Sequence, residues 1–220
     1  MSEKRRTSPI LLTLYDRYLE DQQSDAFAAQ AQQHYTPGTL QRLAQVGDRY
    51  RRRAAVLALS FLGDYDCNQV MGCALVDKDR GVRRIAEDGI RAIWKRAGNQ
   101  HHRKRLDDVI ELLEHHRYEE AASLGTELIE QAPWFAEAWN QRALAYQQLE
   151  RYTDSIRDCR QALEINPYHY AAAAGMGQCY LQLNDRISAL ECFRRALRLN
   201  PNLEGVRAKV VYLQKSLKDE

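Results

Sequence analysis

Long apolar runs, disulfide-type cysteine patterns and prolines are all scarce in this 220-residue chain. The best early apolar run, residues 10–14, is soon followed by Asp16 and Arg17, so it is too short for a membrane span of about 18 residues or for a signal peptide. The five cysteines are an odd number without the spacing of a disulfide framework, which indicates reduced thiols. We therefore expect a cytoplasmic protein that neither spans a membrane nor is secreted.

The five prolines are unevenly placed, and none occurs in residues 38–132. Because proline inside a helix costs about 3 kcal/mol, a long proline-free segment rich in Ala, Leu, Arg and Gln favours helices. The clustered Val, Ile and Thr alternation and the Asn-Gly turns of β-hairpins do not occur. With 45% hydrophobic and 28% charged residues, the chain has enough apolar material for a core, which excludes a disordered protein. The sequence predicts an all-α fold.

A 34-residue period runs through the second half of the chain, where Pro133, Pro167 and Pro201 are evenly spaced. Other positions recur at the same interval: Tyr118 and Tyr152, Tyr146 and Tyr180, Leu149 and Leu183, Ala162 and Ala196, and Asn166 and Asn200. Each unit contains two stretches with helical apolar spacing, separated in the central unit by a break at Glu150-Arg151. The period and the paired helices predict a repeat protein.

The two better-defined units share a pattern of aromatic, small and apolar residues. The pattern is Trp139, Arg142, Ala143, Tyr146, Ser155, Cys159, Ala162 and Pro167 in one unit, and Met176, Gly177, Tyr180, Ala189, Phe193, Ala196 and Pro201 in the next. It resembles the tetratricopeptide repeat family over residues 102–220, although a first unit departs from it, with Arg105, Val109 and Leu112 at the Trp, small and Tyr positions. The resemblance implies an α-solenoid of antiparallel helix pairs, with units at about 102–135, 136–169 and 170–203 and a capping helix at 204–218.

A different repeat, with a spacing of 31 residues, occurs in the first half. The related positions are Asp48 and Asp79, Arg52 and Arg83, Ala55 and Ala86, Leu59 and Ile90, and Leu62 and Ile93. The stretch from residue 74 to residue 83 resembles the HEAT repeat family, in which an aspartate and a Val-Arg pair begin the second helix. We therefore expect HEAT-like repeats in residues 37–97, and the copy at residues 54–62 is apolar almost all round, as in a buried central helix.

The boundary between the two repeat blocks is expected at Gly98-Asn99-Gln100. This gives a first block of residues 1–98, with N-terminal helices and HEAT-like repeats, and a second block of residues 99–220. Because a repeat does not bury its apolar face alone, we expect the two blocks to stack into one α-solenoid.

Catalytic and metal-binding patterns are not found in the sequence. The histidine pairs at residues 101–102 and 115–116 would lie about 21 Å apart along one helix, too far for one metal ion. Cys159 occupies a position where the resemblance implies a core phenylalanine, which favours a packing role. Neither a P-loop nor a G-x-G-x-x-G, G-x-S-x-G or H-E-x-x-H motif occurs. We expect no enzymatic activity, no cofactor and no metal.

The resemblance implies that the first helix of each unit lines a concave peptide-binding groove. The residues at these positions are Leu106, Ile110, Leu113, Asn140, Leu144, Gln147, Gln148, Ala174, Gln178, Leu181 and Gln182. Their mixture of amides and modest apolar side chains suits an extended segment or a helix that makes backbone and side-chain contacts. Family members that bind a terminal carboxylate use Lys, Arg and Asn, whereas the corresponding positions here are Leu106, Ile110, Gln141, Ala171 and Gly175. The leading hypothesis is therefore a non-catalytic scaffold or adaptor for a protein or peptide segment.

An alternative function rests on charge. Residues 1–105 contain 19 Lys/Arg and 12 Asp/Glu, a net charge of +7, whereas residues 106–220 contain 13 and 18, a net charge of −5. A candidate anion-binding patch consists of Arg51, Arg52, Arg84 and Arg91, and its partner would be nucleic acid or an acidic protein. The competing interpretation is that these arginines lie on solvated helix faces, with Arg52 and Arg83 linking neighbouring helices.

Overall fold

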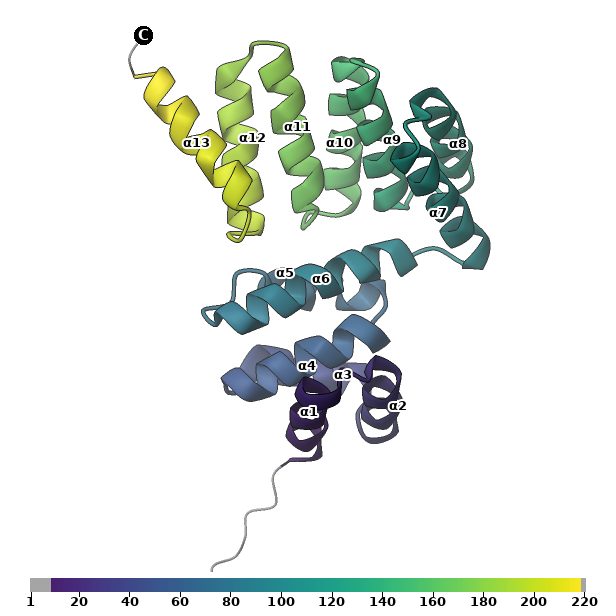
Figure 1. The fold of residues 1–220 in the computed structure, drawn as a ribbon, viewed down its shortest axis with the longest axis vertical. Coiled ribbons are helices and arrows are strands. Elements are labelled where there is room, and N and C mark those ends of the chain that lie inside the picture. Colours follow the sequence, from purple (N-terminus) through teal and green to yellow (C-terminus); the bar gives the residue numbers. More distant parts are fainter. Residues whose placement is uncertain (1–8, 219–220) are drawn as a thin grey trace, which may run out of the picture. The chain divides into compact units, whose positions relative to one another are not determined.

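The computed structural model describes residues 9–218, and every regular element in that range is helical (Figure 1). The predicted all-α fold is confirmed. No helix in the described range combines the length and the apolar character that crossing a membrane requires. The chain forms two compact units that divide between Ile93 and Trp94, a few residues before the glycine at which the sequence suggests a boundary.

The first unit consists of short antiparallel helices. They are α1 (Ile10–Asp21), α2 (Ser24–His34), α3 (Pro37–Val46), α4 (Arg49–Leu62), the short 3₁₀ helix η1 (Tyr65–Cys67), α5 (Asn68–Ala74) and α6 (Arg80–Arg96), whose last residues belong to the second unit. Residues 54–60 of α4 are all buried, as their apolar character indicates. A side chain at Gly89 in α6 would collide with Ser60, so this glycine allows α6 to approach α4 closely.

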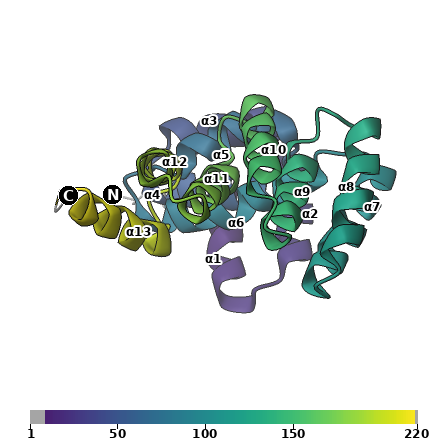
Figure 2. The same cartoon turned by 90° about the horizontal axis from the view of Figure 1, so that it is seen from above.

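The second unit repeats one helix pair along its length (Figures 1 and 2). Its helices are α7 (Gln100–Glu114), α8 (Tyr118–Gln131), α9 (Ala136–Gln148), α10 (Tyr152–Ile165), α11 (Tyr170–Gln182), α12 (Arg186–Leu199) and α13 (Glu204–Ser216). Adjacent helices pack as antiparallel neighbours, which is the arrangement of a tetratricopeptide solenoid. The start positions of α9, α11 and α13 reproduce the 34-residue period of the sequence.

The turns inside the three pairs share one backbone conformation. His116, Glu150 and Asn184 follow the first helix of each pair and have positive φ angles of 59°, 58° and 61°. A left-handed residue at this point ends a helix sharply and redirects the chain. The break that the sequence indicates at Glu150 is therefore a repeated structural turn.

Small residues allow the helices of the second unit to pack closely. A Cβ atom at Gly177 in α11 would lie 2.8 Å from the Phe193 ring in α12, so only glycine leaves room for this aromatic side chain. Cys159 is buried among Ala143, Ala162 and Met176, in agreement with a packing role. Burial also raises the pKa of the Cys159 thiol, which keeps it protonated and unreactive.

One charged pair replaces apolar packing in this core. Arg142 lies at the position that Met176 occupies in the next repeat, and its guanidinium donates to both carboxylate oxygens of Asp158, at 2.7 and 2.9 Å. It also donates to Thr126 Oγ1 at 3.0 Å and lies near the rings of Trp139 and Tyr146. The arginine is therefore accommodated by a partner for its charge and by aromatic faces.

Candidate peptide-binding surface

The sequence-predicted groove residues lie on the first helices of the pairs, α7, α9 and α11. We call their shared side the inner face and define it by the positions that recur every 34 residues, such as Leu144 and Gln178. The exposed members are Leu144, Gln148 and Gln182; the half-buried members are Ile110, Leu113, Gln147, Ala174, Gln178 and Leu181; the buried members are Leu106 and Asn140. The predicted set therefore falls into an accessible part and a closed part.

Leu106 lies in the core of the second unit. Its side chain is fully buried and packs with Leu128, Ile129 and Phe135. A ligand has no access to it, so we leave it out of the proposed contact surface.

A buried carboxylate organises the closed part of the inner face. Glu137 in α9 is 6% exposed, and its Oε1 accepts hydrogen bonds from Gln141 at 2.6 Å and from Asn140 at 3.4 Å. Its Oε2 lies 3.0 Å from Nε2 of His169. Burial alone would raise the pKa of Glu137, but these hydrogen bonds outweigh burial and hold its pKa below the ordinary value. The amides of Asn140 and Gln141 are thus directed to an internal acceptor.

The hydrogen bonds of His169 define its tautomer. Its Nδ1 accepts from the backbone N–H of Ala172 at 3.2 Å, so it caps the N-terminus of α11. Nδ1 therefore carries no proton, and Nε2 donates to Glu137. The imidazole also stacks on the indole of Trp94, with ring centroids 4.4 Å apart and an interplanar angle of 17°. Glu137 and His169 form a fixed structural element that leaves neither group available as a catalytic acid or base.

The sequence does not predict this cluster of Glu137, Asn140, Gln141 and His169. Glu137 and Gln141 have the i, i+4 spacing of neighbours on one helix, and that spacing is the local signal that was available. The link from Glu137 to His169 spans 32 residues and depends on how two repeats pack.

The accessible part of the inner face is built mainly from amides. Leu144, Gln147 and Gln148 on α9 lie at positions equivalent to Gln178, Leu181 and Gln182 on α11. A glutamine side chain both donates and accepts hydrogen bonds, so a row of them can pair with the backbone of an extended peptide. The two leucines add apolar contact area.

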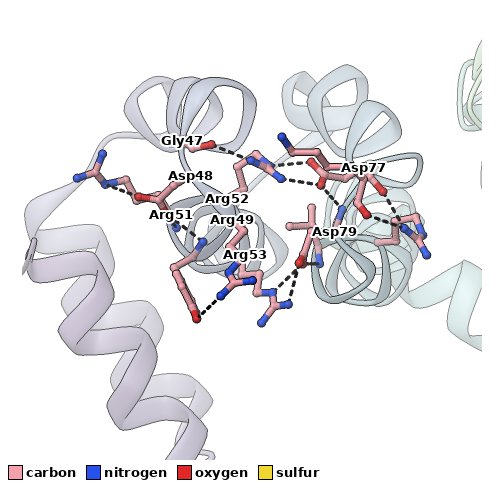
Figure 3. Close-up of polar contacts among 12 residues, drawn as sticks. Gly47, Asp48, Arg49, Arg51, Arg52, Arg53, Asp77 and Asp79 are labelled. Atoms are coloured by element: carbon pink, nitrogen blue, oxygen red, sulfur yellow. Dashed lines mark hydrogen bonds and ion pairs between the residues drawn. The ribbon is translucent and has the colours of Figure 1, made fainter.

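Arg52 of the candidate anion-binding patch and its neighbour Arg53, which is not a member of the patch, are both engaged in ion pairs (Figure 3). Arg52 is buried and donates to both carboxylate oxygens of Asp77, at 2.8 and 2.9 Å, and to the carbonyl of Gly47 at 2.8 Å. Arg52 therefore links the start of α4 to the segment before α6, as expected if it joins neighbouring helices. Arg53 makes the same paired contact with Asp79, at 2.7 and 2.8 Å. These two positive charges are already compensated.

The other three arginines of the patch lie at the surface. Arg51 is 3.6 Å from a carboxylate oxygen of Asp48, and Arg91 is 2.7 Å from one of Asp88. Arg84 is exposed, and no ion pair of the described residues includes it. Arg51, Arg52 and Arg91 therefore already have carboxylate partners, which reduces the positive charge that the patch offers to an external anion.

Metal-type clusters are not found in the part of the chain that the structure describes, where no three His, Cys, Asp or Glu side chains come together. The five cysteines are unpaired, and Cys73 alone among them is exposed. Burial raises the pKa of Cys192 to about 11, so its thiol is also protonated.

Comparison with known families identifies the repeats of the second unit. The tetratricopeptide repeat family matches residues 136–169 and 171–203, which confirms the predicted tetratricopeptide repeats in α9–α12. These matches lie within the second unit, and the HEAT-like character of the first unit stays a prediction.

Relatives share this repeat region. The Hsp70-Hsp90 organizing protein of Triticum aestivum is 29% identical over 100 residues, which are 46% of this chain and 17% of that protein. The chain thus spans less than a fifth of the length of this relative. The first tetratricopeptide domain of Spaghetti (RPAP3), bound to the HSP90 peptide SRMEEVD, matches with a TM-score of 0.53 and 21% identity over 55% of this chain and 96% of that one. The Sgt2 domain from Aspergillus fumigatus matches with a TM-score of 0.52 and 16% identity over 55% and 82%. Both structures share the fold of the second unit.

Proposed function

We propose that this protein is a non-catalytic scaffold that binds an extended peptide or protein segment on the inner face of its second unit. One observation carries the proposal: exposed and half-buried side chains recur in register on α9 and α11. Each of the two helices contributes one leucine and two glutamines to this set, which consists of Leu144, Gln147, Gln148, Gln178, Leu181 and Gln182. Such a surface pairs with a peptide backbone and packs against its apolar side chains.

The relatives support a peptide as the partner. One related domain is bound to an HSP90 peptide, and the wheat relative is named for organizing Hsp70 and Hsp90. The five positions that would hold a terminal carboxylate carry no cation here: Leu106, Ile110, Gln141, Ala171 and Gly175. In addition, Gln141 is held by the ionised Glu137. We infer that the ligand lies along the helices, without a terminal carboxylate at these five positions.

The first unit is proposed to be a HEAT-like structural block. The link from Arg52 to Asp77 supports this, because it ties one helix pair to the next. The alternative function, nucleic-acid binding by the arginines, is not favoured by any comparable observation, since Arg52 is buried and paired. We also propose a cytoplasmic location, which the unpaired cysteines support.

Affinity capture with the full chain tests the peptide-binding proposal. The test variant combines Leu144→Glu and Gln178→Glu, which remove apolar contact area and place negative charge on the accessible inner face. Ile187→Glu is the control, because Ile187 is 64% exposed but lies on α12, a second helix of its pair. We expect partners that the unmodified chain and the control retain and the test variant loses. An identical set of proteins on all three would contradict the proposal.

A further inference from the structure

The C-terminal helix α13 continues the register of the first helices. It begins at Glu204, 34 residues after the start of α11 at Tyr170 and 68 after the start of α9 at Ala136. Tyr212 is therefore equivalent to Leu144 and Gln178, and Lys209 is equivalent to Gln141 and Gly175 on the two preceding first helices. The sequence predicts only a capping role for this helix, but its register places Lys209 and Tyr212 at positions equivalent to those of the inner face.

The packing of α13 leaves Tyr212 accessible. Val210 and Leu213 are buried against α12, where they contact the cluster that contains Phe193. Tyr212, on another side of the helix, is 71% exposed. A tyrosine with that much exposure at the end of an amide-lined surface is available for contact with a partner.

The ammonium group of Lys209 is directed toward α11. Its Nζ donates a hydrogen bond to Oε1 of Gln178, and it lies 5.4 Å from the centroid of the Phe193 ring. Neither neighbour carries a negative charge. The ion pairs of the described chain do not include Lys209, so its charge is uncompensated.

The charge of this end of the inner face has one sign. The equivalent positions on α9 and α11 are uncharged: Asn140, Gln141, Leu144, Gln147 and Gln148, and Ala174, Gly175, Gln178, Leu181 and Gln182. On α13, two of the same positions carry Lys209 and Lys215. An acidic side chain therefore finds an attractive field beside α13 and no opposing carboxylate at these positions.

We infer that the peptide-binding surface extends onto α13 and selects an extended segment with an acidic side chain, which pairs with Lys209 while Tyr212 packs beside it. This inference rests on the proposed function and deepens it. Gln178 contributes twice, because its amide orients Lys209 and faces the peptide from α11.

Fluorescence anisotropy with the full chain and three short peptides of equal length tests this inference. The peptides alternate leucine with glutamate, glutamine or lysine. The variants are Lys209→Gln and Tyr212→Ala, with Lys218→Gln as the control because it removes an exposed lysine just beyond α13 with the same change in charge. We expect the glutamate peptide to bind most tightly and to weaken about fivefold in Lys209→Gln, about fivefold in Tyr212→Ala, and not at all in the control.

The outcomes separate the inference from the proposed function. Equal binding of the glutamate and glutamine peptides, or a Lys209→Gln variant that binds like the control, would overturn the inference. If the glutamine peptide still binds in that case and loses affinity in the Leu144→Glu, Gln178→Glu variant, the proposed function stands. Failure of all three peptides to bind would overturn both.

Discussion

The two units use the same ion pair, arginine with aspartate, in different surroundings. In the first unit, Arg52 and Asp77 join two helical segments, with side chains 8% and 14% exposed. In the second unit, Arg142 and Asp158 lie within the helix packing, with side chains 12% and 2% exposed, and the arginine occupies the position of Met176 in the next repeat. The Arg52–Asp77 pair holds the segment before α6 against α4, whereas the Arg142–Asp158 pair is part of the helix core. Removal of an aspartate should lower the free energy of unfolding more when the aspartate is more deeply buried, because the arginine is then left charged and unpaired in an apolar environment.

Removal of Asp158 is expected to have the largest effect on this comparison. Asp158→Ala leaves Arg142 buried without its carboxylate and should lower the free energy of unfolding by about 3–5 kcal/mol. Urea unfolding followed by tryptophan fluorescence measures this, because Trp94, Trp134 and Trp139 all lie in the second unit. Asp154→Ala, which removes a partly exposed aspartate from α10, is the control and should cost about 0.5 kcal/mol. Equal effects of the two variants would show that the buried pair is not part of the stabilising core.

Loss of Arg52 should be the next largest effect. Arg52→Ala removes three hydrogen bonds to Asp77 and Gly47 and should reduce the opening free energy of the α4 amides by about 2–3 kcal/mol. Hydrogen exchange read by mass spectrometry measures it. Arg84→Ala, at an exposed position of the same basic patch, should leave this exchange unchanged. If Arg52→Ala instead left stability intact and reduced retention on DNA or RNA, the anion-binding alternative would be favoured.

A smaller, pH-dependent effect is expected at the neighbouring pair of Arg53 and Asp79. The Arg53 guanidinium lowers the pKa of Asp79 to about 2, below its unfolded value of about 3.9. The stabilisation is therefore complete above about pH 4 and disappears as the pH falls toward 2. Thermal unfolding should show Asp79→Asn less stable than the unmodified chain at neutral pH and equal to it near pH 2. A difference in unfolding temperature between the two proteins that did not change with pH would contradict this assignment.

The repeat register was predictable because it depends on residues close together in the sequence. Proline at the end of each unit and the 34-residue interval place α9–α12 correctly, and the turn at Glu150 follows from the same pattern. Helix period alone, however, did not distinguish a groove position from a core position. Leu106 on α7 and Asn140 on α9 occupy equivalent positions, and both are buried because they face the neighbouring helices.

Non-local contacts account for what the sequence did not predict. The bond between Glu137 and His169 forms only when two units pack, so no spacing on one helix reveals both partners. The sequence similarly did not show that Arg52 is unavailable to an external anion, because its partner Asp77 comes from a separate segment that folds back against α4. Net charge along the chain describes composition, whereas the charge on a surface depends on tertiary pairing.

Site-specific photo-crosslinking tests the central claim most directly. A photoreactive phenylalanine analogue placed at Leu144 should capture a partner segment through the accessible inner face, and the same analogue at Ile187 on α12 should not. Capture at Leu144, competed by an unlabelled peptide that binds the chain, is the result that the account predicts. Equal capture at both positions, or capture at Ile187 alone, would contradict it.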